Sequence, residues 1–182
     1  MNTGQVMMVL GAFTLLSVLV LNVNGMITGT MQTSLEMQAT LNAVSIAQSM
    51  MDEILKREFD EASINTRIYN TNDMTPTAGL GPNLGETIFG IDSTFQSKSK
   101  FDDVDDYHNY RRKVKDSHLW WYYVTNSVEY VNETEPDQKI WSQTFVKRIT
   151  ITVANQYMLK KKNSNEVQPV VLKEFAVYRR YF

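Results

Sequence analysis

Cysteine is absent from this 182-residue chain, and histidine occurs only as His108 and His118. A chain without cysteine forms no disulfide and has no thiolate metal ligand or cysteine nucleophile. Two histidines are too few for a multi-histidine zinc site. The chain also lacks a glycine-rich phosphate loop, a nucleophile elbow and a dinucleotide fingerprint. We therefore expect no enzymatic activity and no cofactor, apart from the calcium ion considered below.

Charged residues are absent before Glu36. Within this uncharged stretch an apolar run begins at Val6, and a membrane-spanning helix needs about 20 mostly apolar residues. We therefore predict a transmembrane segment over residues 6–27. The residues before it lack the basic side chains of a secretory signal peptide, so we expect the segment to remain in the mature protein. Because neither flank carries nearby Lys or Arg, charge does not indicate the orientation of the segment.

Proline does not occur before Pro76, so nothing forces a break in a long helix over residues 5–59. After the apolar third, large apolar side chains recur at helical spacings. One stripe contains Met31, Leu35, Leu41, Val44, Met51 and Leu55, and a second contains Ile46, Met50 and Ile54. We expect these two stripes to form a broad face that covers a sheet.

The pattern changes after residue 60, where we expect a globular domain over residues 60–182. Residues 60–118 contain half of the glycines and half of the prolines, together with many Asn, Thr and Ser residues, and are predicted to form a loop-rich connector. Residues 119–182 hold aromatic and β-branched runs separated by polar turns, which indicates an antiparallel sheet of three strands, 119–131, 144–153 and 170–182. The predicted fold class is therefore α+β, with a long N-terminal helix packed on a C-terminal antiparallel sheet.

Four carboxylates within five residues form the densest charge cluster. They are Asp102, Asp103, Asp105 and Asp106. Clustered carboxylates are hard-oxygen ligands of the kind that bind Ca²⁺, although the spacing is not that of an EF-hand. The alternative is an acidic turn whose aspartates cap backbone amides in contact with water. The net charge of −2 gives no general attraction to nucleic acid, and we predict none as a partner.

The N-terminal region resembles the helix of type IV pilins and type II secretion pseudopilins, particularly the minor subunits. Gly4 followed by Gln5 and an apolar run is similar to a prepilin peptidase site, with residues 1–4 as the leader. The stretch 43–54 and the acidic segment 101–107 are similar to minor-subunit sequences. The match departs from the family pattern because Val9 stands where most bacterial members have a glutamate, and because the leader lacks a basic residue.

This resemblance implies a structural subunit of a pilus-like or pseudopilus filament. The subunit would wait in the inner membrane with its C-terminal domain outside the cytoplasm, and would then join copies of itself or related subunits in a periplasmic or extracellular filament. The residues implied in filament-core packing are Val9, Phe13, Leu16, Val20, Gly25 and Gly29. The alternative is a single-span anchored subunit of an envelope complex, whose outer domain binds a partner.

Overall fold

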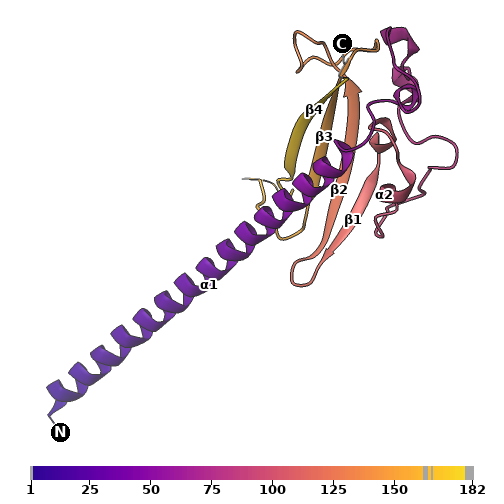
Figure 1. Cartoon of the computed structure of the whole chain (residues 1–182). Coiled ribbons are helices and arrows are strands. Elements are labelled where there is room, and N and C mark those ends of the chain that lie inside the picture. Colours follow the sequence, from indigo (N-terminus) through magenta and orange to yellow (C-terminus); the bar gives the residue numbers. More distant parts are fainter. Residues whose placement is uncertain (1, 162–163, 165, 179–182) are drawn as a thin grey trace. The chain divides into compact units, whose positions relative to one another are not determined.

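The structure is a computed structural model that describes residues 2–161, 164 and 166–178. It contains two compact units, residues 1–38 and residues 39–182. One helix, α1 (Thr3–Ile54), supplies all the secondary structure of the first unit and the beginning of the second. The sheet of the second unit follows in the C-terminal half of the chain (Figure 1). This arrangement confirms the predicted α+β class.

The sheet has four antiparallel strands in the order β1-β2-β3-β4, so each strand pairs with its neighbour in sequence. The strands are β1 (Arg111–Asp116), β2 (Trp120–Tyr130), β3 (Val146–Ala154) and β4 (Val170–Val177). Side chains of β2 and β3 alternate between buried and more exposed positions, as expected of a sheet with one covered face. The centre of the core is formed by Tyr122, Val124, Val128, Ile149, Ile151 and Val153.

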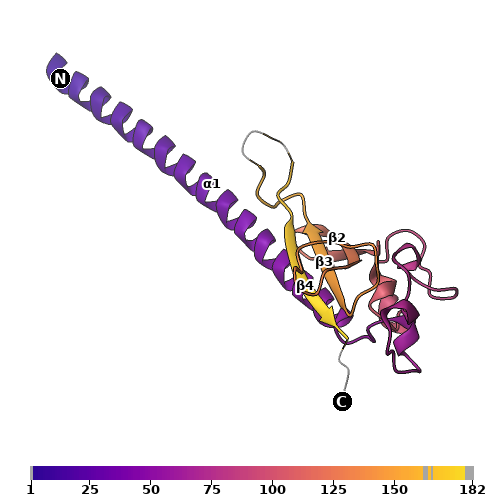
Figure 2. The ribbon, with the colours of Figure 1, turned by 90° about the horizontal axis from the view of Figure 1, so that it is seen from above.

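The C-terminal turns of α1 cover the buried face of this sheet (Figure 2). Their buried side chains are Ala39, Ala43, Ala47, Met50, Met51 and Ile54. The Tyr122 hydroxyl donates a hydrogen bond to the Ala39 carbonyl at 3.2 Å. Three alanines at intervals of four residues bring the helix backbone close to the sheet, because their side chains take little space.

The packing face differs from the predicted face. Met50, Met51 and Ile54 are buried as expected, but Leu41 is 70% exposed and Val44 is 36% exposed. The periodicity of large apolar side chains predicted that those residues face the sheet. The helix instead turns its small alanines toward the sheet, because it lies close to Tyr122. The second unit therefore carries apolar helix residues that its own core does not bury.

The sheet also begins earlier than predicted, because β1 lies inside the segment 60–118 that was expected to be connector. The sequence of β1 is dominated by basic residues and lacks the alternation of a half-buried strand. Arg112 is nevertheless only 3% exposed. An ion pair with Glu53, described below, permits this burial, and a charge partner from a distant segment cannot be read from strand periodicity.

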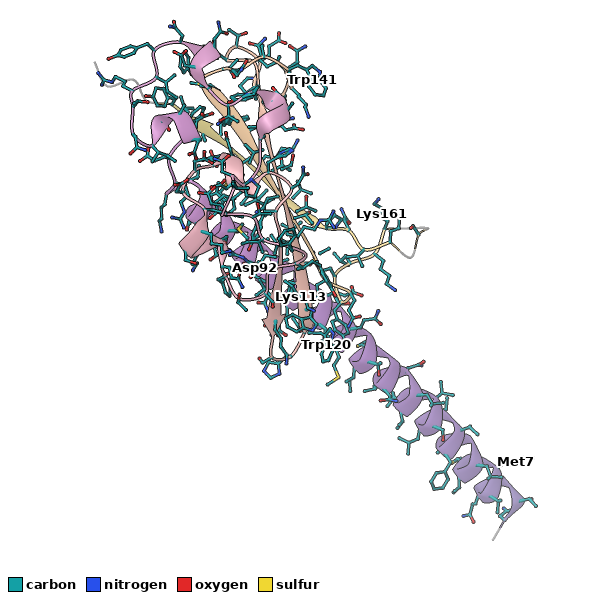
Figure 3. The ribbon with its side chains drawn as sticks, turned by 90° about the vertical axis from the view of Figure 1, so that its right-hand side faces the viewer. Met7, Asp92, Lys113, Trp120, Trp141 and Lys161 are labelled. Carbon is teal, nitrogen blue, oxygen red and sulfur yellow. The ribbon has the colours of Figure 1, made fainter. Side chains whose placement is uncertain are left out.

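The rest of the connector is loop-rich, as predicted. Residues 60–110 contain one four-residue helix, α2 (Ser97–Lys100), and four short 3-10 turns. The turns are η1 (Glu61–Ser63), η2 (Thr71–Asp73), η3 (Thr77–Gly79) and η4 (Asp105–Tyr107). The connector borders the sheet at β1, where the amide of Lys113 donates to the carbonyl of Asp92 at 2.8 Å; both residues are labelled in Figure 3.

The ends of the long helix and of the last strand also differ from the prediction. The long helix begins at Thr3 and ends at Ile54, not at 5 and 59, so Gly4 lies within its first turn. The chain leaves the helix before Phe59 because the next residues bond elsewhere: the Glu58 amide donates to the Asp102 carbonyl at 3.1 Å. The last strand ends at Val177, and the predicted continuation over 179–182 lies outside the described residues.

Candidate functional site

The described residues of the first unit form an apolar helix surface that no other element of this unit covers. Every described residue of this unit is at least partly exposed, and its large apolar side chains are mostly half exposed or more. Met7, labelled in Figure 3, is 77% exposed and projects from the helix into open space. A helix that is apolar all round is expected to lie in lipid or among other helices. By length and composition this helix can span a membrane.

The residues predicted for filament-core packing all lie on this open surface. Val9, Phe13, Leu16 and Val20 are 49–62% exposed. A methyl group added at Gly25 or Gly29 would meet no atom of the described residues within 4 Å, apart from the backbone of the helix itself. A glycine inside a helix costs about 1 kcal/mol relative to alanine. No contact among the described residues requires glycine at these positions, and a surface without side chains at Gly25 and Gly29 allows the close approach of another helix.

The predicted processing residues, Gly4 and Gln5, are exposed in the first helical turn. The Gln5 amide donates to the Asn2 carbonyl at 2.9 Å, and no element of the first unit covers this turn. A peptidase would need to open only this terminal turn to reach the Gly4–Gln5 bond, because helix ends fray readily. Cleavage at this bond stays a prediction.

In the second unit, Lys147 is the centre of a buried charge cluster. It projects from β3, and its ammonium group is fully buried. The ammonium donates to Asp60 Oδ2 and to the Phe59 carbonyl, each at 2.8 Å, and to Asp105 Oδ1. It also lies 4.4 Å from the centre of the Phe59 ring. Lys147 therefore connects the chain just after α1, the acidic segment and the sheet.

The two carboxyl partners of Lys147 have different electrostatic surroundings. Burial tends to raise the pKa of Asp60, but Lys147 and backbone amides such as that of Thr75 lower it overall. Burial raises the pKa of Asp105 to about 7, and the nearby charge of Asp60 adds to this rise. The hydroxyl of Tyr130 donates to Asp60 Oδ2 at 3.0 Å. The surroundings of Asp60 therefore favour its ionised form more than those of Asp105 do.

The four predicted calcium ligands do not surround a single point. Asp105 bonds Lys147, whereas Asp103 and Asp106 cap backbone amides: Asp106 Oδ2 accepts from the amide of Asp103 at 3.3 Å, and Asp103 Oδ1 accepts from that of Asp106 at 3.1 Å. Asp102 alone is exposed. Capping agrees with the alternative interpretation of this segment, but contact with water does not, because Asp103, Asp105 and Asp106 are at most 2% exposed.

Burial raises the pKa of the three buried aspartates, Asp103, Asp105 and Asp106. Desolvation, followed by the charge of Asp105, raises the pKa of Asp103 to about 7. Desolvation and the charge of Asp103 raise the pKa of Asp106 to about 8, and the charge of Glu86 contributes to the rise. One oxygen of each carboxyl group, Asp103 Oδ2, Asp105 Oδ2 and Asp106 Oδ1, is buried without a hydrogen-bond partner.

A second buried charge cluster joins the last turn of α1 to β1. Arg112 donates two hydrogen bonds of 2.8 Å to the two carboxylate oxygens of Glu53. Glu53 also accepts from Ser97 at 2.8 Å and from Tyr107 at 3.0 Å. Desolvation raises the pKa of Glu53, but Arg112 and Ser97 lower it overall. Bidentate geometry of this kind holds two elements in a fixed register.

Glu61, Glu86 and Asp102 form a further cluster that the sequence did not reveal. A carboxylate oxygen of each lies within 4.8 Å of those of the other two. Of the four predicted ligands, only Asp102 belongs to it. Glu61 and Glu86 lie in the loop-rich segment, far in sequence from Asp102, and only the fold brings the three together. No family model, curated protein or solved structure matches this chain.

Proposed function

We propose that this chain is a structural subunit of a pilus-like or pseudopilus filament, which assembles through its apolar N-terminal helix. The observation that carries the proposal is the uncovered apolar surface of residues 3–38. Before assembly this helix would hold the protein in the inner membrane. In the filament it would pack against the same helix of neighbouring subunits, with residues 39–182 facing outward.

The length of the helix supports assembly as well as anchoring. At 1.5 Å per residue, residues 3–54 extend for about 78 Å, whereas crossing the hydrocarbon core takes about 30 Å. Exposed apolar side chains continue beyond the predicted transmembrane segment 6–27, for example at Met31, Met37 and Leu41. A lipid anchor alone gives these residues no partner. A neighbouring helix along their length would bury them.

The alternative is a single-span anchored subunit of an envelope complex. It uses the same apolar segment but leaves apolar side chains such as Met31, Met37 and Leu41 exposed outside the membrane. Val9, at the position where most bacterial pilin-like proteins have a glutamate, is the feature that favours this alternative. The two functions differ in whether Gly4–Gln5 is cleaved and in what the helix touches.

The intact mass of the protein from its host membrane tests the processing step. We expect the mass of a chain that begins at Gln5, with or without an added methyl group. This result would show that a peptidase removes residues 1–4 before assembly. A chain that retains residues 2–4 would contradict the prediction and favour the anchored subunit.

A further inference from the structure

The face of the sheet that α1 does not cover carries polar and aromatic side chains around a cavity. Alternation along β2 and β3 places the core residues on one face and their neighbours on the other. The neighbours on the second face include Tyr123, Thr125 and Ser127 of β2 and Thr150 and Thr152 of β3. These five residues help to line a cavity of about 430 Å³, and Arg111 of β1 lines it as well. All of these residues belong to the second unit.

Four hydroxyl groups lie side by side along this cavity. The strand register places Thr125 opposite Thr152 and Ser127 opposite Thr150. Side chains opposite each other on one face of a sheet are about 5 Å apart, so the two pairs form one compact group. Within the described part of the chain, these four hydroxyl groups have no hydrogen-bond partner. Each can donate and accept a hydrogen bond, which suits a ligand that is itself rich in hydroxyl groups.

Tyr123 provides an open aromatic ring beside the hydroxyl groups. It is 48% exposed. Trp121 lies on the same face of β2, but the ammonium groups of Lys113 and Lys115 lie 4.3 Å and 5.8 Å from the centre of its ring. The Trp121 ring is therefore already in contact with two cations, whereas Tyr123 is open to a ligand. An aromatic ring can pack against the apolar C–H face of a sugar ring.

A row of basic residues runs along β1 at the border of the cavity. Arg111, Lys113 and Lys115 occupy every second position of the strand, so they share one face and lie about 7 Å apart. Arg111 stands opposite Thr125, and Lys113 stands opposite Tyr123. No ion pair among the described residues includes any of the three. A row of cations without acidic partners attracts a polymer of negative charge.

We propose that this face of the sheet binds an acidic polysaccharide. Tyr123 packs against a sugar ring, the four hydroxyl groups bond to the hydroxyl groups of the sugar, and the basic row pairs with its carboxylates. Single-stranded nucleic acid fits less well, because it binds by stacking successive bases on open aromatic rings, and Lys113 already lies over the ring of Trp121. The site goes beyond the proposed function, and it is the same in a filament subunit and in an anchored subunit.

Fluorescence anisotropy with three labelled polymers and the full chain in detergent tests the site. The polymers are polygalacturonate, which carries carboxylates on sugar rings, uncharged dextran, and oligodeoxythymidylate as single-stranded DNA. We expect binding to polygalacturonate that weakens as salt is added, because salt screens exposed charges. Dextran should not bind, since it lacks the carboxylates. Oligodeoxythymidylate should bind at least about tenfold more weakly than polygalacturonate, which corresponds to about 1.4 kcal/mol.

The variants Arg111→Gln and Tyr123→Ala test the residues. Arg111→Gln should weaken polygalacturonate binding about tenfold or more, because it removes a charge-assisted hydrogen bond. Tyr123→Ala should also weaken binding, by several-fold, because the sugar loses its aromatic contact. Thr152→Val keeps the shape of the side chain but removes one hydroxyl, and should weaken binding without lowering Tm.

The control Lys56→Gln removes one exposed cation just after α1 and should leave the affinity unchanged. Three results would overturn the proposal: no binding to polygalacturonate, binding to oligodeoxythymidylate that is equal or tighter, or equal affinities for Arg111→Gln and Lys56→Gln. The second result would identify the face as a nucleic-acid site, and the third would reduce it to general charge attraction.

Discussion

Replacement of Lys147 by methionine is expected to lower the stability of the second unit by about 3–5 kcal/mol, the usual cost of removing one partner from a buried ion pair. Methionine fills a similar volume but leaves Asp60 and Asp105 without their cation. Both carboxyl groups are at most 2% exposed, so water cannot take the place of the ammonium group. For a unit of this size the loss corresponds to a fall in Tm of roughly 6–20 °C. Thermal unfolding followed by circular dichroism measures it.

The matched control is Lys139→Met. Lys139 also forms an ion pair, 2.7 Å from Glu129, but its side chain is 39% exposed. Exposed pairs contribute about 0–1 kcal/mol, so this variant should melt close to the original protein. Adding Asp60→Asn to Lys147→Met should recover part of the lost stability, because it removes the carboxylate whose pKa is lowered and which is therefore left uncompensated. Equal melting temperatures for Lys147→Met and Lys139→Met would show that the buried cluster does not stabilise the fold.

Replacement of Leu16 by arginine is expected to abolish stable membrane association. Leu16 lies at the middle of the predicted segment 6–27, where an arginine costs about 2.5–3.5 kcal/mol on insertion scales and the favourable leucine contribution is also lost. The helix has no other charged residue before Glu36 and therefore no partner for the arginine. The measurement is the fraction of protein that remains in the membrane pellet after an alkaline carbonate wash.

A control substitution of the same type separates insertion from folding. Leu84 is fully exposed in a loop of the second unit, so Leu84→Arg introduces the same charge away from the apolar helix. This variant should remain in the pellet like the original protein. If Leu16→Arg also remained there, the apolar helix would not be what holds the protein in the membrane.

Much of the fold follows from local patterns in the sequence. The uncharged, proline-free N-terminal stretch predicts one long helix, and alternation in residues 144–153 predicts a strand that the structure contains as β3. The structure confirms both. The alanines at 39, 43 and 47 were missed as packing residues, because small side chains give a weak periodic signal even where close approach makes them essential.

The buried charges could not be predicted, since each depends on contacts between distant segments. Lys147 shares the parity of Ile149 and Ile151, so alternation places it on the buried face, but the sequence does not show that Asp60 and Asp105 lie there as its partners. The strand β1 could not be predicted for the same reason, because the burial of Arg112 depends on its ion pair with the distant Glu53. The density of carboxylates in the sequence identifies the acidic segment as unusual but does not give the contacts of each aspartate. In the folded chain Asp105 bonds Lys147, Asp103 accepts from a backbone amide, and Asp102 lies near Glu61 and Glu86.

The most direct test of assembly through the apolar helix is photo-crosslinking in the host membrane and in the sheared surface fraction. A benzoylphenylalanine at Phe13, which is 62% exposed, would report what touches the helix, and the same probe at Phe89, in a loop of the second unit and 92% exposed, is the control. We predict that the Phe13 probe crosslinks to another copy of this chain or to a subunit with a similar apolar helix, whereas the Phe89 probe gives little of that product. Crosslinks from Phe13 to lipid alone in both fractions would contradict assembly through the helix.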